Sequence, residues 1–334
     1  MFFDLCFPVE VVDFLAAKVT EYVGFCTTPS DRRQARHEAK TTTKGHCEVP
    51  KVNVDGTEVD GFDRTHVYGV LGILITMGIT QKRRMTDHWG VSPHDNYSLI
   101  RSCMPRDLFL LFYSRFLHMA SAAPVGQDHP DYDSKHHIRE FEDLLNKVWS
   151  TIVTPGAWLS FDEQMIKSTA VAMRGILRFN PLKPIKHGIK GWAVACPSGW
   201  TYVQVVDGGS WGDKKLRPTE KCPLGRTTRM VLHVLLKACP EFGRQLDGSG
   251  VSVAMDNYFT SATLLRCLAT HDIFAVGTVR KNRMGMGGAL QFWKEKKEST
   301  KDRGDMLFAR NGHLTVVEWI DSKEEGKRLG GGNG

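Results

Sequence analysis

The sequence has 334 residues, of which 41% are hydrophobic and 24% are charged. These values are typical of a folded globular protein and exclude an intrinsically disordered chain. The formal net charge of +7 is a mild basicity that favours polyanionic partners without requiring them. The length predicts two domains, or one domain with a helical appendage.

Cysteine spacing and hydropathy exclude several further classes of protein. The eight cysteines contain no CxxC pair, so a zinc knuckle is not expected. No basic stretch precedes a long apolar segment at the N-terminus, so no secretory signal is predicted. The longest apolar run, residues 67–79, is too short to span a bilayer and predicts a buried helix. We expect reduced thiols and a nuclear or cytoplasmic protein that is not secreted.

Residues 1–155 are predicted to form a mainly helical N-terminal region. Apolar residues recur at helical spacing over four segments, 9–25, 67–79, 108–117 and 137–153. Asp63 is expected to cap the second of these helices, and Pro105 begins the third. One apolar face of the third helix is expected to contain Leu108, Leu111, Phe112, Phe116 and Leu117. The polar segment 27–63 is predicted to be a mobile loop, and residues 120–133 a second loop.

After Pro155 the hydrophobic pattern changes from helical to extended. Strands are predicted over 157–161, 188–196, 200–206, 251–255, 274–279 and 314–320, and helices over 228–239 and 261–270. The second and third strands form a hairpin around Pro197-Ser198-Gly199. The order of strand, hairpin, helix, strand, helix, strand predicts a mixed α/β fold with a ribonuclease-H-like core over residues 156–325. Residues 326–334 are glycine-rich and are predicted to be a disordered tail.

Two of these strands each deliver one aspartate. The first leads to Asp162 and the fourth to Asp256, 94 positions later. If the two strands are neighbours, their carboxylates can share a divalent cation such as Mg²⁺, which suits chemistry on phosphodiesters. An aspartate at the end of a strand is more often a turn or helix-cap residue. The pattern alone therefore leaves a metal site and a turn role open.

The residues around both aspartates resemble those of piggyBac-type transposases. The first motif reads WLSFDEQM at 158–165 and is followed by NPLKPIKHGIK at 180–190. The second reads MDNYFTS at 255–261 and is followed by VGTVR at 276–280. Upstream, residues 74–78, 88–89 and 115–118 fit the helical region of that family. The resemblance covers about residues 60–321.

The resemblance implies a ribonuclease-H-like fold in which three aspartates and Mg²⁺ cleave and join DNA strands at transposon ends. It assigns Asp162 and Asp256 as the first two catalytic, metal-binding aspartates. The third is implied downstream of this chain, and Asp321 matches a strand motif instead. Ser168-Thr169-Ala170 also replaces the basic segment that the family usually has after the first motif. Because two ligands would hold metal weakly, we expect no strand transfer by this chain.

Basic side chains around these motifs are candidates for contacting DNA phosphates. They are Arg174, Arg178, Lys183, Lys186, Lys190 and Lys281. Solvated surface positions are an equal alternative, since phosphate contacts have no strict sequence signature.

Other polar and aromatic residues are interpreted as structural. Alternation along the strand predicts that Glu163 points away from Asp162. Asp207 precedes two glycines and is interpreted as a turn residue. His136-His137 is interpreted as surface. Trp192, Trp200 and Tyr202 are expected to pack in the core or across strands.

Three functions remain open. The first is a piggyBac-transposase-derived domain that binds double-stranded DNA at transposon ends, with a possible homodimer and no strand transfer of its own. The second is a non-enzymatic DNA-binding or protein-interaction module on the same scaffold. The third is a simple metal nuclease, which would need a compensating acid such as Asp207 or Glu163 near the pair.

Overall fold

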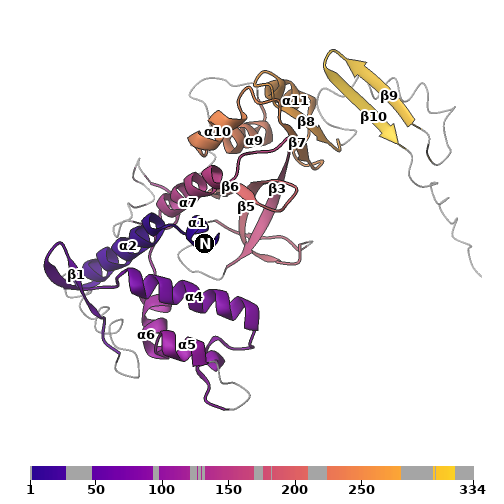
Figure 1. Ribbon diagram of the computed structural model, residues 1–334. Helices are drawn as coiled ribbons and strands as arrows, with labels where there is room; N and C mark the ends of the chain where they lie inside the picture. Colours follow the sequence, from indigo (N-terminus) through magenta and orange to yellow (C-terminus); the bar gives the residue numbers. More distant parts are fainter. Residues whose placement is uncertain are drawn as a thin grey trace, which may run out of the picture.

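The computed structural model describes residues 2–27, 47–92, 98–120, 126, 129, 132–168, 176–181, 183–209, 224–279, 304 and 306–319. Its elements form an N-terminal helical part, followed by a part built on a six-stranded sheet (Figure 1). A separate hairpin of β9 (Met306–Asn311) and β10 (Leu314–Trp319) extends beyond the sheet. Within these described ranges, no helix is both long and apolar enough to cross a membrane.

The predicted helices of the N-terminal part are confirmed, with small shifts at their ends. They are α2 (Val9–Thr27), α4 (Arg64–Thr80), α6 (Arg106–Leu111) with η2 (Phe112–Phe116), and α7 (Arg139–Ile152). The short helices α1 (Phe2–Cys6), η1 (Met85–Trp89) and α5 (Ser98–Cys103) were not predicted. Asp63 caps α4 as predicted, because its carboxylate accepts a hydrogen bond from the His66 amide at 3.1 Å. The His66 ring accepts one from the Asp63 amide in return.

The expectation of a loop over residues 27–63 is wrong for the end of that segment. Residues 51–60 form an antiparallel hairpin of β1 (Lys51–Val54) and β2 (Thr57–Asp60). Asp55 and Gly56 have φ values of 50° and 83°, which a two-residue hairpin turn requires. The Asp-Gly pair between alternating valines was a hairpin signal in the sequence. Residues 28–46 lie outside the described part of the chain.

The helical part has its own apolar core around a phenylalanine cluster. Phe62 packs edge to face on Phe112, with ring centroids 4.9 Å apart. The predicted apolar face after Pro105 is confirmed for Leu111, Phe112 and Phe116, which are buried. Phe109 is also buried but was not predicted on this face. The helix changes to π geometry after Leu111, and Phe112 and Phe116 within it remain buried.

The second part is a mixed sheet with the order β4-β5-β3-β7-β8, in which β6 also pairs with β5. Its strands are β3 (Trp158–Lys167), β4 (Leu177–Phe179), β5 (His187–Ala195), β6 (Thr201–Val206), β7 (Ser252–Met255) and β8 (Phe274–Gly277). β5 is antiparallel to β3 and β6, whereas β7 is parallel to β3 and β8. The predicted hairpin and parallel strands are therefore present. The short strands β4 and β9 were not predicted.

Three helices pack on one face of this sheet. They are α9 (Arg226–Leu236), α10 (Pro240–Leu246) and α11 (Ala262–Ala269). The shared core includes Leu159, Phe161, Val253, Met255, Val231, Val234, Phe242 and Leu264. Trp192 and Tyr202 are buried in it, as predicted. Pro240, which was expected only to end α9, is the first residue of α10, where its missing amide proton has no cost.

Helix α7 covers the free edge of β6. The buried Asn146 side chain donates to the Gln204 carbonyl at 2.9 Å and accepts from the Gln204 amide at 2.8 Å. One turn earlier, the Glu142 carboxylate accepts from the Val206 amide and pairs with the buried Lys135. Burial raises the pKa of Glu142 above its ordinary value despite the Lys135 charge. Side chains of α7 thus replace a neighbouring strand.

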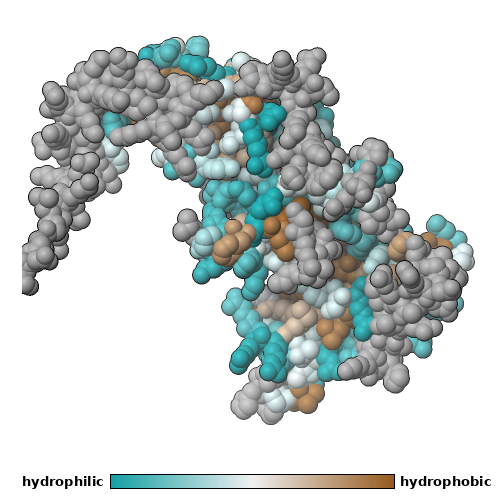
Figure 2. Space-filling model, turned by 180° about the vertical axis from the view of Figure 1, so that it is seen from behind, coloured by the Kyte–Doolittle hydropathy of each residue, from teal (hydrophilic) through white to brown (hydrophobic). Residues whose placement is uncertain are grey.

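The described surface has no uniform chemical character in the view of Figure 2. Hydrophobic residues lie in small groups among hydrophilic ones on that face.

His136 and His137, interpreted as surface residues, are half-buried. The His137 ring also lies edge to face against the His118 ring. The two histidines are therefore partly covered and not fully exposed.

Candidate functional site

The register of two parallel strands makes Asp162 and Asp256 neighbours. Phe161 of β3 is paired with Met255 of β7, and the next residue in each segment is an aspartate. Both aspartates are exposed, as is Ser160, two residues before Asp162 on the same face of β3. Alternation places the Asp162 side chain on the face of β3 opposite the core that α9, α10 and α11 share, and Asp256 directly follows the neighbouring strand β7.

Asp162 lies inside a strand and does not end it. The sequence predicted a strand that stops at Phe161, whereas β3 continues to Lys167 and pairs with β5 from Ser160 to Lys167. The carboxylate of Asp162 accepts a hydrogen bond from the amide of Glu163 at 2.7 Å. On the other face, Phe161 is buried and packs edge to face on Phe259, with centroids 4.8 Å apart. This aromatic pair anchors both aspartate-bearing segments to the same core.

The motif that contains Asp256 forms a compact strand-to-helix turn. The Asp256 carboxylate accepts from the Tyr258 amide at 2.8 Å, and its carbonyl accepts from the Thr260 hydroxyl at 2.7 Å. Ser261 then caps α11 by accepting from the Leu264 amide. Asp256 thus has the turn role that its residue type favours, and it is exposed.

Glu163 points to the face opposite Asp162, as alternation predicted. Its carboxylate forms ion pairs with Lys190 and, at 3.3 Å, with Lys183. Burial opposes the charged form of Glu163, but the two lysines outweigh it and hold its pKa below the ordinary value. The Lys190 ammonium also lies over the Tyr258 ring, 4.9 Å from its centroid. Tyr258 was not singled out in the sequence, although it stands two residues after Asp256.

The remaining basic candidates have different environments. The Arg178 guanidinium lies 3.8 Å from the buried carboxylate of Asp207, which also accepts from the Gly209 amide as a turn residue. Lys186 is exposed. Arg174 and Lys281 lie outside the described residues. Three of the six candidates, Arg178, Lys183 and Lys190, are therefore engaged in ion pairs within the protein.

The donor set at the aspartate pair fits Mg²⁺ only in part. Two exposed carboxylates on neighbouring segments are hard oxygen donors of the kind that Mg²⁺ prefers. Among the residues that the structure describes, no group of three or more His, Cys, Asp or Glu side chains could hold a metal ion. Glu163 and Asp207, the two acids considered as replacements, are committed to their own ion pairs. The simple metal nuclease thus has no support among these residues.

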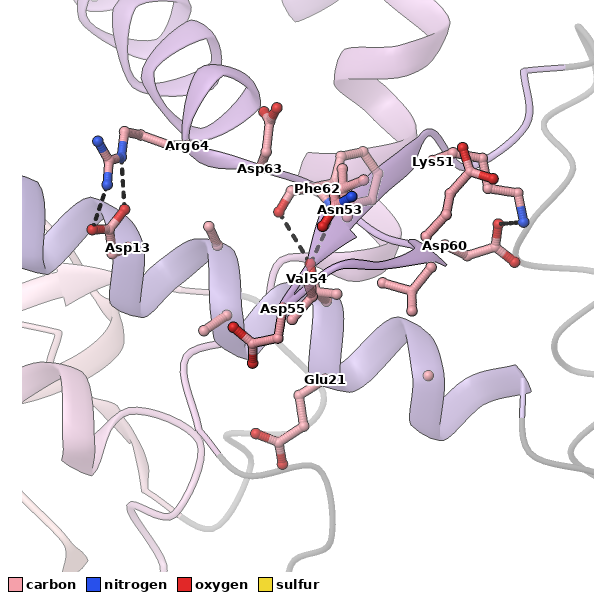
Figure 3. Close-up of a pocket in the computed structure, with 17 residues that line it drawn as sticks. Asp13, Glu21, Lys51, Asn53, Val54, Asp55, Asp60, Phe62, Asp63 and Arg64 are labelled. Atoms are coloured by element: carbon pink, nitrogen blue, oxygen red, sulfur yellow. Dashed lines mark hydrogen bonds and ion pairs between the residues drawn. The ribbon is translucent and has the colours of Figure 1, made fainter.

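Two cavities differ in charge and in place. One of about 390 Å³ lies beside Glu163, Lys190, Arg178, Asp207 and Tyr258, under the aspartate-bearing strands. The other, of about 1130 Å³, lies between α2, the β1–β2 hairpin and the start of α4 (Figure 3).

The larger cavity is acidic. Its lining carries six carboxylates but only two basic side chains, Lys51 and Arg64. Each of those two is paired, Lys51 with Asp60 and Arg64 with Asp13 (Figure 3). Carboxylates repel phosphates, so this cavity is not a place for DNA.

Fold and motifs together define a transposase-like protein, and the comparison with protein families agrees. The chain belongs to the family described as Transposase IS4, whose model matches residues 2–326. It is similar to human PiggyBac transposable element-derived protein 2, with 26% identity over 259 residues, 76% of this chain and 40% of that protein. It is also similar to human PiggyBac transposable element-derived protein 3, with 27% identity over 257 residues, 75% of this chain and 39% of that protein. The resemblance predicted from the motifs is confirmed.

A solved structure shows the same fold. The chain matches the cryo-EM structure of a piggyBac transposase synaptic complex with hairpin DNA, with a TM-score of 0.62 and 21% identity. The match covers 96% of this chain and 57% of that one. The chain thus spans about two fifths of the length of the human relatives and little more than half of the solved transposase.

Proposed function

We propose that the chain is a DNA-binding domain derived from a piggyBac-type transposase, built on a ribonuclease-H-like core and without strand-transfer activity of its own. The observation that carries this proposal is the β3–β7 register, which pairs Phe161 with Met255 and so places the next residues, Asp162 and Asp256, on neighbouring segments. Similarity to a transposase solved with hairpin DNA supports double-stranded DNA as the partner. A nuclear location and a homodimer that brings two DNA ends together belong to the same proposal.

In this proposal Asp162 and Asp256 would hold Mg²⁺. When bound, the cation would offset the repulsion between the carboxylates and stabilise negative charge on phosphodiester oxygens. The chain's own contribution is to orient the carboxylates through the amides of Glu163 and Tyr258. Two side-chain donors hold Mg²⁺ loosely, because a firm site surrounds the cation with an octahedron of oxygens.

DNA binding is expected to depend strongly on salt and weakly on sequence. Neutralising phosphates releases counterions, so affinity for duplex DNA should fall at least tenfold between about 50 and about 200 mM salt. Lys186→Ala removes an exposed lysine beside β5 and should reduce the slope of log affinity against log salt by about 1. Fluorescence anisotropy with a labelled duplex measures both quantities.

The matched control is Lys237→Ala, which removes another exposed lysine, at the end of α9. It should leave the salt slope unchanged. An affinity that does not change with salt would contradict binding through DNA phosphates, and equal slopes for both variants would contradict a phosphate contact by Lys186.

Purified protein with Mg²⁺ or Mn²⁺ is expected to neither cleave nor join transposon ends. Misplacing a reactive group by about 1 Å already costs ~10²-fold in rate, and an absent metal ligand should cost more. Asp162→Ala and Asp256→Ala should therefore change no measurable rate on a labelled DNA hairpin. If the protein cleaves DNA and Asp162→Ala abolishes the cleavage, another group completes the metal site. The proposal that the chain has no strand-transfer activity would then be wrong.

A second function, a non-enzymatic interaction module, is favoured by one observation. Three of the basic candidates for DNA contacts are paired with acids of the same chain. If the protein binds no duplex DNA even at low salt, this second function replaces the first.

A further inference from the structure

We propose that Lys190 is a positioning residue that holds the two aspartates in a fixed relation to each other. This inference rests on the proposed metal-binding role of Asp162 and Asp256 and goes beyond it. Lys190 belongs to β5, and its ammonium lies on the face of the sheet that carries Glu163, opposite the Asp162 side chain. From there it reaches across β3 to two groups, the Glu163 carboxylate and the Tyr258 ring.

Each group that Lys190 contacts orients one aspartate through its backbone. The amide of Glu163 donates to the Asp162 carboxylate at 2.7 Å, while the Glu163 side chain pairs with Lys190. The amide of Tyr258 donates to the Asp256 carboxylate at 2.8 Å, while the Tyr258 ring lies under Lys190. One lysine therefore links the two residues whose amides fix the two carboxylates. Partners of metal ligands commonly control metal affinity in this indirect way.

The contacts of Lys190 are strong enough for this role. Its side chain and that of Glu163 are only 20% and 18% exposed, so water screens their ion pair less than a surface pair. A cation over an aromatic face adds a second attraction whose direction is set by the ring. The link joins β3 to the turn after β7, in addition to the four-residue parallel pairing and the Phe161–Phe259 contact.

A positioning role and a purely electrostatic role of Lys190 predict opposite changes in cation affinity when the lysine is removed. Removing a nearby positive charge strengthens the binding of a divalent cation if charge alone matters. If Lys190 positions the ligands, its removal weakens cation binding. Lys183 is the matched control, because it carries the same charge and pairs with the same carboxylate of Glu163.

The test is a Mn²⁺ titration of the full chain, followed by the electron paramagnetic resonance signal of free Mn²⁺. Lys190→Met and Tyr258→Leu should each weaken binding about tenfold. Lys190→Arg should retain most of the affinity, because a guanidinium can pair with Glu163 and stack on Tyr258. Lys183→Met should leave binding unchanged or slightly tighter. The proposal would be overturned if Lys190→Met binds Mn²⁺ as tightly as the unchanged protein, or more tightly.

A second measurement does not depend on metal. Amide hydrogen exchange of Glu163 and Tyr258 should be faster in Lys190→Met than in Lys183→Met, while core amides exchange equally in both. Uniformly faster exchange would mean general destabilisation and would overturn the positioning role. The proposed metal role fails if the unchanged protein binds no Mn²⁺, or if Asp162→Asn does not remove the binding. In that case hydrogen exchange still decides the role of Lys190.

Discussion

Gly243→Ala is expected to lower the free energy of unfolding by about 3 kcal/mol, since overpacking against rigid backbone is costly. Gly243 is buried in α10, where the chain turns back against the end of α9. A Cβ atom at this position would lie 2.3 Å from the carbonyl oxygen of Leu236 and 2.8 Å from its carbon. Both atoms are backbone, so the clash can be relieved only by moving one helix away from the core. Urea unfolding followed by circular dichroism measures the loss.

The control is Gly72→Ala, in the exposed part of α4. A Cβ there meets nothing within 4 Å, and alanine favours a helix over glycine by about 1 kcal/mol. The control variant should therefore gain stability while Gly243→Ala loses it. Equal stabilities of Gly243→Ala and the unchanged protein would show that α9 and α10 do not approach so closely.

Asn146→Ala is expected to cost about 3 kcal/mol, because it leaves a backbone donor and a backbone acceptor without their partners. The Asn146 side chain is 2% exposed and makes both hydrogen bonds to Gln204 that a neighbouring strand would make. Alanine fills none of this space and restores neither bond. The amide of Gln204 should exchange faster with solvent in the variant, and urea unfolding gives the loss of stability.

Asn53→Ala is the matched comparison for this change. Asn53 also accepts a backbone hydrogen bond, from the Gly56 amide at 2.9 Å, but in an exposed turn. Water replaces that bond, so the cost should stay below about 1 kcal/mol. Similar losses for the two asparagine variants would contradict the role of α7 in covering the β6 edge.

The elements that the sequence predicted are those with a clear local signal. α2 and α4 have helical spacing and, for α4, a capping aspartate. The β5–β6 hairpin has two apolar runs around a Pro-Ser-Gly turn. β4 has three residues and α10 seven, too few for a period to be read. Such short elements exist because neighbours pair with them or pack on them.

The site was predicted unevenly for a similar reason. The motifs correctly identified the strands that carry the two aspartates and the direction of Glu163. They did not predict that Lys183 and Lys190 pair with Glu163, so these lysines were considered as DNA contacts or as solvated surface positions. Ion pairs between residues far apart in the chain depend on which strands are neighbours in the sheet. The local periodicity of the sequence does not determine this strand order.

By itself the sequence determined the class of protein, the helical and extended halves of the chain, and the two aspartate motifs. These depend on residue types within a few positions of one another, which local patterns record. Only the tertiary structure decided that Asp162 lies within a long strand and that one lysine links both aspartate-bearing segments. β3, β5 and the turn after β7 come from three separate stretches, and only their packing into one sheet brings Glu163, Lys190 and Tyr258 together.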